Sequence, residues 1–457
     1  MQRSNVLLKT KAVLVTGART PFVKSFGQLM KADTLHLATA AVGGLLSKTK
    51  IDPKEIDQII WGNVVLQTNI PNCAREIVID LNLPKNVTAN VTSMACASGL
   101  HAMSQAIMLI ESGRADVVIA GGSDSTSNAE IPLPKNITHA LMKAQKGGVA
   151  GFFSEAGYNP MKWLPTGFSI AERSTGKTMG WHGDVIAELN NISRGDQEAL
   201  ALASHKKAAE AEKKGYFKDE VVPVLLEKRG KQVEIIKDDL IQRDTEKVKE
   251  KMPKLKPSFR KEKGTITAAT SSPLTDGASA MLIMSEEKAK SLGYATDVTI
   301  KSFHFSGIDP FPQLLLAPVL GWGPCLKEAG ITAKDIDLFE IHEAFAAQVL
   351  ATIKCLGSPE FFEKYAGTSE VVLKGDFDFS KLNVNGSSIA LGHPFAATGG
   401  RIVTSLANEL RRTGKKHGLV SICAAGGLGG VAILEHSTQK FGQRCGLSVF
   451  LFLYLEW

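Results

Sequence analysis

The stretch that decides the fold is Asn90–Gly122, NVTSMACASGLHAMSQAIMLIESGRADVVIAGG. A short β-type run leads into a turn, and from Leu100 the apolar residues recur at helical spacing until Gly113 ends the helix. The apolar run 117–120 then returns as a buried strand. This order predicts an α/β protein and places Cys96 where a strand turns into a helix, close to the helix N-terminus.

The environment of Cys96 permits chemistry but does not establish it. Unpaired backbone N–H groups and the positive end of the helix dipole favour a thiolate at this position. The neighbouring alanine, serine and glycine residues leave room for a substrate to approach the sulfur. A buried, inert side chain is nevertheless the more common fate of a single cysteine in an apolar chain. A catalytic Cys96 therefore requires partners from elsewhere in the sequence.

Length and composition limit the classes of protein to which the chain can belong. A chain of 457 residues exceeds one simple hydrophobic core, so we expect two or three domains. The net charge of +7 is compatible with a phosphate-bearing small molecule or an anionic membrane surface. The sequence lacks the arginine-rich or aromatic-interleaved stretches that are typical of nucleic-acid binding. We therefore expect no nucleic-acid partner.

Cysteine usage and the N-terminus bear on the cellular compartment. The six cysteines are scattered without a CxxC pair, which argues against a zinc site and a disulfide framework and suits a reducing compartment. No apolar run approaches the roughly 20 residues that span a bilayer. The N-terminus has no acidic residue before Asp33 and several basic ones, which is typical of a transit peptide. A strand predicted at 12–15 begins too early for a full presequence, so a short basic arm explains the same residues equally well.

An internal repeat indicates how the chain is organised. The segment 51–60, IDPKEIDQII, is matched by 331–340, ITAKDIDLFE, with both first isoleucines, the lysine and the aspartate shared. The unit around Cys96 has its own counterpart in 383–430, where a glycine-rich turn precedes a helix and a buried strand. Two matches in the same order predict a duplicated α/β unit, with two similar halves packed face to face and a mostly parallel sheet covered by helices.

The predicted domain limits follow from this repeat. Between the halves lies a long segment without regular alternation, and we interpret it as an inserted lid-like loop subdomain. Its first part mixes aromatic residues with lysines, which suits a membrane surface, a partner protein, a lipid-like substrate or a self-packed insert. The predicted limits are 1–125 for the N-terminal half, 126–263 for the insert, 264–290 for the return of the N-terminal half, 291–435 for the C-terminal half and 436–457 for a divergent tail.

Three further motifs accompany Cys96. They are 340–345, EIHEAF; 391–395, LGHPF; and 421–429, SICAAGGLG. Strand ends and strand-to-helix turns gather along one edge of a doubly wound sheet, so two cysteines and two histidines are expected to meet in one pocket. A thiol activated by imidazole forms a thioester, a second thiol moves a proton at a carbon beside a carbonyl, and N–H donors stabilise the oxyanions. This set predicts carbon–carbon bond cleavage or formation between acyl thioesters.

Across about residues 11–435 the sequence resembles the thiolases, the 3-ketoacyl-CoA and acetyl-CoA acyltransferases. It looks most like the β subunits of the mitochondrial trifunctional β-oxidation complex and their bacterial long-chain counterparts. The resemblance implies a duplicated thiolase fold, layered α-β-α-β-α, with an inserted lid. The motifs that carry it are Arg19–Phe22, Met94–Cys96, Gly121–Gly122, Thr267–Gly277, His342–Phe345, Gly392–Pro394 and Cys423–Gly429.

The resemblance also implies roles for single residues. Cys96 matches the acylated nucleophile, and His393 matches the group that activates it and lines the first oxyanion hole. Cys423 matches the acid/base at the substrate α-carbon. His342 stands where many thiolases have an asparagine that holds a water in the oxyanion hole, so a related role, directly or through water, is expected. The second oxyanion hole corresponds to the backbone N–H groups of Cys96 and Ala425.

Substrate contacts are implied in the same way. Ser272 matches the serine that contacts coenzyme A, although Thr270 nearby replaces a frequent asparagine. Met179 resembles part of the lid that lines the acyl pocket. The resemblance implies no metal and no cofactor, with coenzyme A as a co-substrate.

The activity implied is cleavage of medium- or long-chain 3-ketoacyl-CoA by coenzyme A in fatty-acid β-oxidation. A ketoacyl synthase would have histidine where this chain has Cys423. Alternatives are an acetoacetyl-CoA thiolase acting in synthesis and a non-catalytic thiolase-like scaffold or lipid-binding subunit.

The implied assembly is a thiolase homodimer in a complex with a hydratase/dehydrogenase α subunit, with peripheral membrane contact through the lid. The implied location is mitochondrial, in the matrix at the inner membrane, with the bacterial cytoplasm as the alternative. The tail after Glu435 departs from the family and is interpreted as a splice or reading-frame artefact, or as a membrane-touching segment.

Overall fold

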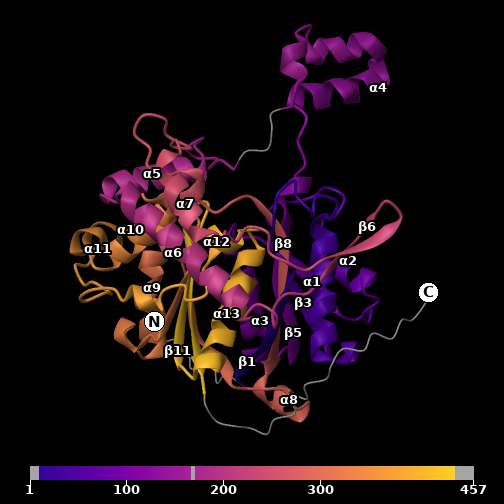
Figure 1. Cartoon of the computed structure of the whole chain (residues 1–457). Coiled ribbons are helices and arrows are strands. Elements are labelled where there is room, and N and C mark those ends of the chain that lie inside the picture. Colours follow the sequence, from indigo (N-terminus) through magenta and orange to yellow (C-terminus); the bar gives the residue numbers. More distant parts are fainter. Residues whose placement is uncertain (1–9, 166–169, 438–457) are drawn as a thin grey trace.

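The computed structural model describes residues 10–165 and 170–437 and centres on one large sheet covered by helices (Figure 1). Within these residues the sheet has ten strands in the order β10-β11-β12-β9-β1-β8-β5-β3-β4, with β2 paired to β8. A separate hairpin joins β6 and β7. The strands are β1 (Ala12–Arg19), β2 (Val23–Lys24), β3 (Gln58–Gly62), β4 (Thr88–Thr92), β5 (Val117–Ser125), β6 (Val224–Lys228), β7 (Lys231–Ile235), β8 (Thr275–Ser285), β9 (Val298–Gly307), β10 (Leu338–Ile341), β11 (His417–Ala424) and β12 (Leu428–His436).

The prediction of a mostly parallel sheet is wrong, because the sheet is mixed. Parallel pairs join β3 to β4 and β5, and β10 to β11. The strands β8 and β12 run antiparallel to their neighbours. The reversal at β12 follows from the short turn after β11, where Gly426 and Gly427 both have positive φ, since a tight turn connects only antiparallel strands. The α/β class itself is confirmed.

The two parts of the sheet repeat one arrangement. In the first part β3 and β5 are parallel and β8 follows antiparallel to β5. In the second part β10 and β11 are parallel and β12 follows antiparallel to β11. The two copies of the sequence repeat form equivalent single turns of 3-10 helix, Pro53–Glu55 and Ala333–Asp335, each leading into a strand. Among the described strands the two parts meet where Val13 of β1 pairs with Thr299 of β9.

The three largest clusters of buried apolar side chains lie on the outer face of the first part of the sheet, on the outer face of the second part, and around the helices between the two parts. The helices α1 (Thr34–Thr49) and α2 (Cys73–Asp80) cover the first part of the sheet, and α9, α10 and α11 cover the second. The helices α3 (Ser98–Glu111) and α13 (Ala397–Thr413) contact each other between the two parts. The remaining helices are α4 (Lys135–Ala156), α5 (Met179–Leu189), α6 (Arg194–Lys213), α7 (Thr245–Lys251), α8 (Glu286–Ser291), α9 (Ala317–Ala329), α10 (Ala346–Leu356), α11 (Pro359–Ala366) and α12 (Ser388–Leu391).

The long insertion has two parts of different character. Residues 129–165, which we call the arm, contain α4 and stand away from the rest of the molecule (Figure 1). The arm has its own small apolar cluster, in which Phe152 and Trp163 pack against Ala140. The helices α5 and α6 instead pack on the second half, against α10. The aromatic residues of the arm therefore pack mainly on one another, whereas Trp181 and Phe259 of the insert pack on the second half.

Two further sequence predictions concern the ends of the chain and the membrane. The basic segment before residue 10 and most of the predicted divergent tail, from residue 438, lie outside the described residues. Within residues 10–165 and 170–437, no helix combines the length and apolar character that crossing a bilayer requires.

Candidate active site

Cys96 lies in the turn between β4 and α3, as the sequence predicts. The turn is held by Ser98, whose Oγ accepts from the N–H of Met94 at 2.8 Å and donates to the carbonyl of Ala95 at 2.6 Å. Ala95 has a φ of 45°, a left-handed conformation that L-residues with a side chain rarely adopt. The chain therefore holds a strained backbone immediately before Cys96, which fixes where the sulfur points.

His393 lies directly beside this sulfur. Its Nε2 is 3.1 Å from Cys96 Sγ, although 297 residues separate the two in sequence. The other ring nitrogen, Nδ1, is 2.6 Å from Thr398 Oγ1 on α13. The backbone N–H of His393 donates to Thr275 Oγ1 at 3.0 Å. Because both its main chain and its second nitrogen are held, the imidazole presents Nε2 to the thiol.

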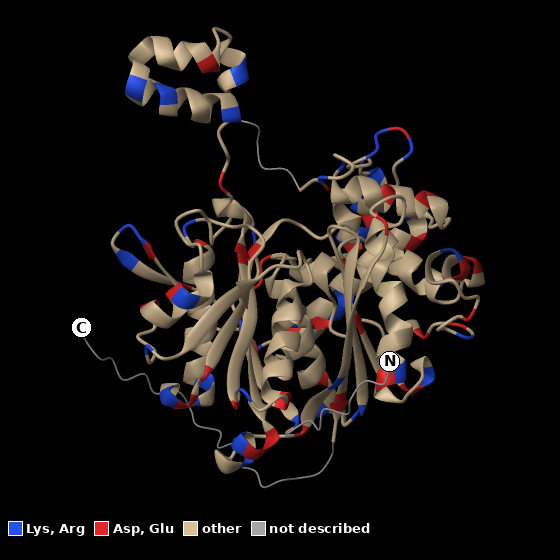
Figure 2. Ribbon diagram, turned by 180° about the vertical axis from the view of Figure 1, so that it is seen from behind, with Lys and Arg blue, Asp and Glu red and all other residues tan. Residues whose placement is uncertain are grey.

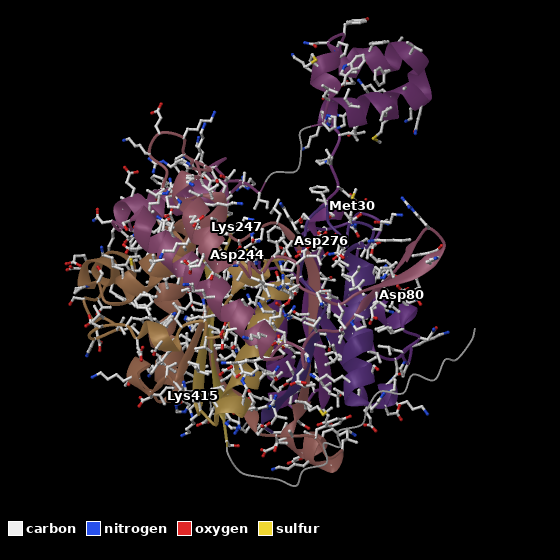
Figure 3. All side chains as sticks on the ribbon, in the orientation of Figure 1. Met30, Asp80, Asp244, Lys247, Asp276 and Lys415 are labelled. Carbon is white, nitrogen blue, oxygen red and sulfur yellow. The ribbon has the colours of Figure 1, made fainter. Side chains whose placement is uncertain are left out.

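The first residues of β8 help to hold His393 in place. Next to Thr275, Asp276 accepts from the backbone N–H of Ser127 at 3.0 Å and from the hydroxyl of the same serine. Asp276 is labelled in Figure 3, where it lies at the end of β8 that faces the arm. The strand end that anchors His393 is therefore tied to the segment after β5.

His342 follows the last residue of β10, and its ring centroid is 4.2 Å from that of His393. Its Nδ1 is 2.8 Å from Ser388 Oγ, at the start of α12. Its Nε2 is buried and has no hydrogen-bond partner among the described residues. One ring nitrogen of each histidine and Cys96 Sγ all lie within 4.8 Å of one another. His342 thus carries a buried, unused polar atom beside the thiol–imidazole pair.

Cys423 and Ala425 reach the same place from β11. Cys423 is 1% exposed, and its thiol is close enough to Cys96 for the charge of one to raise the pKa of the other. The N–H of Ala425 and that of Cys96 itself face the Cys96 thiol, and both act to lower its pKa. The structure therefore brings together all of the residues predicted for the chemistry.

Burial decides the resting protonation of these groups. Desolvation raises the pKa of Cys96 to about 12, and that of Cys423 well above its ordinary value. Burial, with Arg401 nearby, lowers the pKa of His393 to about 3, and burial also lowers that of His342 well below its ordinary value. Desolvation of the Cys96 thiol opposes the helix start, whose N–H groups and dipole favour the thiolate. At neutral pH the site rests as neutral thiols and neutral imidazoles.

The structure also places the two predicted substrate contacts, Ser272 and Met179. The backbone N–H of Ser272 donates to the carbonyl of Ala344 at 3.0 Å, which places Ser272 beside the turn that carries His342. Met179 is the first residue of α5 and packs, partly buried, against the apolar cluster that contains Cys423. Their roles toward coenzyme A and the acyl chain stay predictions.

The hydrogen-bond partners of the two imidazoles were not predicted from the sequence. Thr398 and Ser388 lie within five residues of His393 in a run of small and apolar residues. Their hydroxyls are the nearest side-chain hydrogen-bonding groups on either side of that histidine. This proximity is a usable signal for His393, but nothing in the sequence connects Ser388 with His342.

Charged residues are distributed unevenly over the molecule. Figure 2 shows Lys, Arg, Asp and Glu gathered mainly on the outer helices and loops, with most of the sheet free of them. Arg401 is an exception, since it is 1% exposed, hydrogen-bonds to Ser388 beside His342, and lies close enough to lower the pKa of both histidines. By donor type, the thiol and two imidazoles are also a set that can bind a metal such as Zn²⁺.

A thiol paired with an imidazole, a second buried thiol and convergent N–H donors define an enzyme that transfers acyl groups through a cysteine thioester. The family model "Thiolase, N-terminal domain" matches residues 12–287, and "Thiolase, C-terminal domain" matches residues 294–436. The chain belongs to the thiolase family.

Relatives and solved structures agree with this assignment. Proteins named 3-ketoacyl-CoA thiolase from Shewanella sediminis and Yersinia pestis are 40% and 41% identical, over 93% of this chain and 97% of each relative. The crystal structure of the Bacillus anthracis acetyl-CoA acetyltransferase has a TM-score of 0.80 at 30% identity, covering 94% of this chain and all of that one. The human mitochondrial 3-ketoacyl-CoA thiolase has a TM-score of 0.78 at 30% identity, with coverage of 94% and 100%.

Proposed function

We propose that this thiolase cleaves 3-ketoacyl-CoA with coenzyme A in fatty-acid β-oxidation, releasing acetyl-CoA and an acyl-CoA two carbons shorter. The observation that carries the proposal is the 3.1 Å approach of His393 Nε2 to Cys96 Sγ, with Cys423 and the N–H of Ala425 facing the same sulfur. The names of the relatives over nearly the whole chain support the same substrate class.

The first half-reaction makes the acyl-enzyme. His393 takes the proton of the Cys96 thiol, and the thiolate attacks the 3-keto carbon. The N–H groups of Cys96 and Ala425 stabilise the tetrahedral oxyanion. When the bond between C2 and C3 breaks, the acetyl-CoA enolate forms with its thioester oxygen toward His342 and His393, and Cys423 protonates C2. The pairing of a neutral thiol with a neutral imidazole means that substrate binding must drive the proton transfer.

The second half-reaction releases the product. Cys423, now a thiolate, takes the proton of the coenzyme A thiol, which attacks the acyl group on Cys96. The same two N–H groups bind the second tetrahedral oxyanion. Collapse of this intermediate expels the Cys96 sulfur, which recovers its proton from His393, so every group returns to its starting state.

The test follows coenzyme A-dependent loss of the ketoacyl absorbance in variants of the two thiols. Cys96→Ala should form no acyl-enzyme, whereas Cys423→Ala should accept an acyl group from acetyl-CoA but cleave no carbon–carbon bond. Cys73→Ala is the matched control, since Cys73 is as buried as Cys423 but packs in the first half beside α1. Near-full thiolysis by Cys423→Ala would overturn the assigned role, and no turnover by the wild type at any chain length would favour a non-catalytic subunit.

We further propose a preference for medium or long chains, of the trifunctional type. It rests on the resemblance of the insert to the lid of that branch and on Met179 packing beside the cluster that contains Cys423. A series of 3-ketoacyl-CoA substrates of increasing length should give a kcat/KM that rises beyond acetoacetyl-CoA. A maximum at acetoacetyl-CoA would instead favour the synthetic type.

The arm is proposed as the peripheral membrane contact. Its exposed apolar side chains include Val149, Tyr158 and Met161, which are 74%, 84% and 73% exposed. The lysines of the arm outnumber its acidic residues, which suits an anionic lipid surface, and Figure 3 shows its side chains projecting on all sides. Sedimentation with anionic phospholipid vesicles should retain the wild type and lose Val149→Glu/Met161→Glu. Equal retention of both would refute this role.

The proposed assembly is a homodimer bound to a hydratase/dehydrogenase α subunit, located in the mitochondrial matrix at the inner membrane. The strand β4 supports the homodimer, because it ends the sheet order and its side chains stay partly exposed, whereas β5 is buried throughout. Light scattering should give twice the chain mass, and Val91→Lys on β4 should lower it to one chain. Co-purification from mitochondria would test the partner, and recovery from a bacterial cytoplasm would point to the alternative location.

A further inference from the structure

A buried arginine reaches His342 through a serine. Arg401 Nη2 lies 2.7 Å from Ser388 Oγ, and the same oxygen lies 2.8 Å from His342 Nδ1. The other terminal nitrogen of the guanidinium, Nη1, lies 3.2 Å from Ser387 Oγ. All of these side chains are buried, and Arg401 is 1% exposed. The arginine therefore uses both of its terminal nitrogens on neighbouring serines at the start of α12.

The chemistry of these groups determines where the protons lie. A guanidinium only donates, so Ser388 Oγ must accept from Arg401. In the part of the chain that the structure describes, the remaining side-chain neighbour of Ser388 Oγ is His342 Nδ1, which therefore accepts the serine proton. A neutral imidazole that accepts at Nδ1 carries its hydrogen on Nε2. Burial, His393 and Arg401 all lower the pKa of His342, which keeps the ring neutral.

The nitrogen left with the hydrogen is the one without a partner. His342 Nε2 is buried and makes no hydrogen bond to a described residue, so its hydrogen is available to a ligand in the site. His393 must adopt the opposite tautomer at rest, because its Nε2 has to accept from the Cys96 thiol while Nδ1 donates to Thr398. The hydroxyls of Ser388 and Thr398 thus make His342 Nε2 a hydrogen-bond donor and His393 Nε2 an acceptor.

We propose that Arg401 and Ser388 are positioning residues that hold His342 with its Nε2 hydrogen directed, without an intervening water, at the enolate oxygen formed during cleavage. The proposal rests on the thiolase reaction proposed above and assigns its enolate step to an identified chain of hydrogen bonds.

Arg401 is suited to this task because its charge is not locked in a close ion pair. Its nearest carboxylate oxygen, Glu340 Oε2, is 3.9 Å away and makes no hydrogen bond to a described residue. Burial raises the pKa of Glu340 to about 8, so this carboxyl is mostly neutral at pH 7. The two terminal nitrogens of the guanidinium therefore point at Ser387 and Ser388, a planar geometry that a lysine could not reproduce.

The first experiment reads the tautomer without using activity. The ten histidines are labelled with ¹⁵N, and the signals of His342 are identified by their loss in His342→Asn. In the substrate-free wild type, Nε2 should give the shift of a protonated nitrogen and Nδ1 that of an unprotonated one. A protonated Nδ1 on His342 in the wild type would overturn the proposal whatever the enzyme catalyses.

The second experiment separates the enolate step from acyl transfer. Deuterium exchange at the acetyl-CoA methyl group requires the enolate, whereas exchange of the acetyl group with labelled coenzyme A proceeds through the Cys96 thioester without an enolate. Ser388→Ala should slow the deuterium exchange about 10- to 100-fold, less than the loss of a whole oxyanion donor, and the acetyl exchange less than about threefold. Ser388→Thr, which keeps the hydroxyl, should recover most of the rate.

Ser387→Ala is the matched control, since Ser387 binds the same arginine but does not contact His342. It should leave both exchange rates within about threefold of the wild type. Equal losses of both exchanges in Ser388→Ala, or an equal loss of deuterium exchange in Ser387→Ala, would show a merely structural role and overturn the proposal. Failure of the wild type to catalyse either exchange would instead refute the proposed function and leave the tautomer measurement to decide the positioning.

Discussion

Replacing Gly399 with alanine should separate the two central helices and, with them, the catalytic pair. A Cβ on Gly399 of α13 would lie 2.3 Å from the backbone nitrogen of Leu100 and 2.9 Å from the carbonyl carbon of Gly99, both on α3. These are main-chain atoms, so no side chain can rotate away to relieve the contact. The helices must move apart where they cross.

The size of the effect follows from these distances. Non-bonded contacts are optimal near about 3.5 Å, so the helices must separate by about 1 Å. Overpacking of a core costs about 1–3 kcal/mol of unfolding free energy, and the rigid contact puts Gly399→Ala at the upper end. Cys96 precedes α3 and His393 precedes α13, so the 3.1 Å contact between them must lengthen. A misplacement of about 1 Å costs about 100-fold in rate.

Urea denaturation measures the stability, and mass spectrometry of the acetyl thioester on Cys96 measures the acylation rate. Gly43→Ala is the matched control, because Gly43 is also helical but its Cβ would lie 3.4 Å from a leucine methyl, an ordinary contact. The control should keep the acylation rate and gain up to about 1 kcal/mol from helix propensity. If Gly399→Ala kept both stability and rate, the tight helix crossing would not be what aligns the site.

Further predictions concern buried charges and the metal-binding capacity of the site. Asp238→Ala should lower the unfolding free energy by about 3 kcal/mol in urea titrations, because the fully buried Arg19 loses the carboxylate 2.8 Å away and keeps only that of Glu220 at 3.3 Å. Asp239→Ala, at the surface, should cost under about 1 kcal/mol. Burial raises the folded-state pKa of Glu340 to about 8, above the unfolded value of about 4.3, so the stability conferred by its neutral form is lost as pH rises through 8. Glu340→Gln should therefore gain stability relative to the wild type between pH 5 and 9, and a constant difference would contradict this. Zn²⁺ should inhibit thiolysis by binding the thiol and two imidazoles, with full recovery on adding EDTA, and inhibition that persists after chelation would exclude that site.

The local elements were largely predictable, but their pairing was not. The helix predicted from Leu100 is α3, and the strand predicted at 117–120 is the first part of β5. The strand continues to Ser125 because its small polar residues are buried and pair with β8, although their intrinsic preference for strands is low. The antiparallel placement of β8 depends on a return after a long insertion. No local pattern encodes that return, which is why the mixed sheet was missed.

In the candidate site, too, the local features were predictable from the sequence and the long-range contacts were not. Motif chemistry located the reactive side chains, because each lies at a strand end or turn, and glycine marks three of these places in the sequence, those of Cys96, His393 and Cys423. It did not locate Ser388 or Arg401, since their importance depends on the three-dimensional approach of α12 and α13 to β10. The helix start that favours a Cys96 thiolate is visible in the sequence, whereas the desolvation that raises the pKa of the thiol depends on the folded surroundings.

The repeat explains why one fold with two equivalent halves has a single site. The offset that relates the two copies of the repeat pairs His342 with Gly62. The register of the parallel strands then makes Cys423 equivalent to Ser123. A Cβ on Gly62 would lie 3.2 Å from that of Ala396, in the turn that carries His393. The strand ends of the first half are therefore kept small so that this turn can approach Cys96. The reactive side chains occupy the strand ends of the second half, because the equivalent space in the first is filled by the segment that delivers the base.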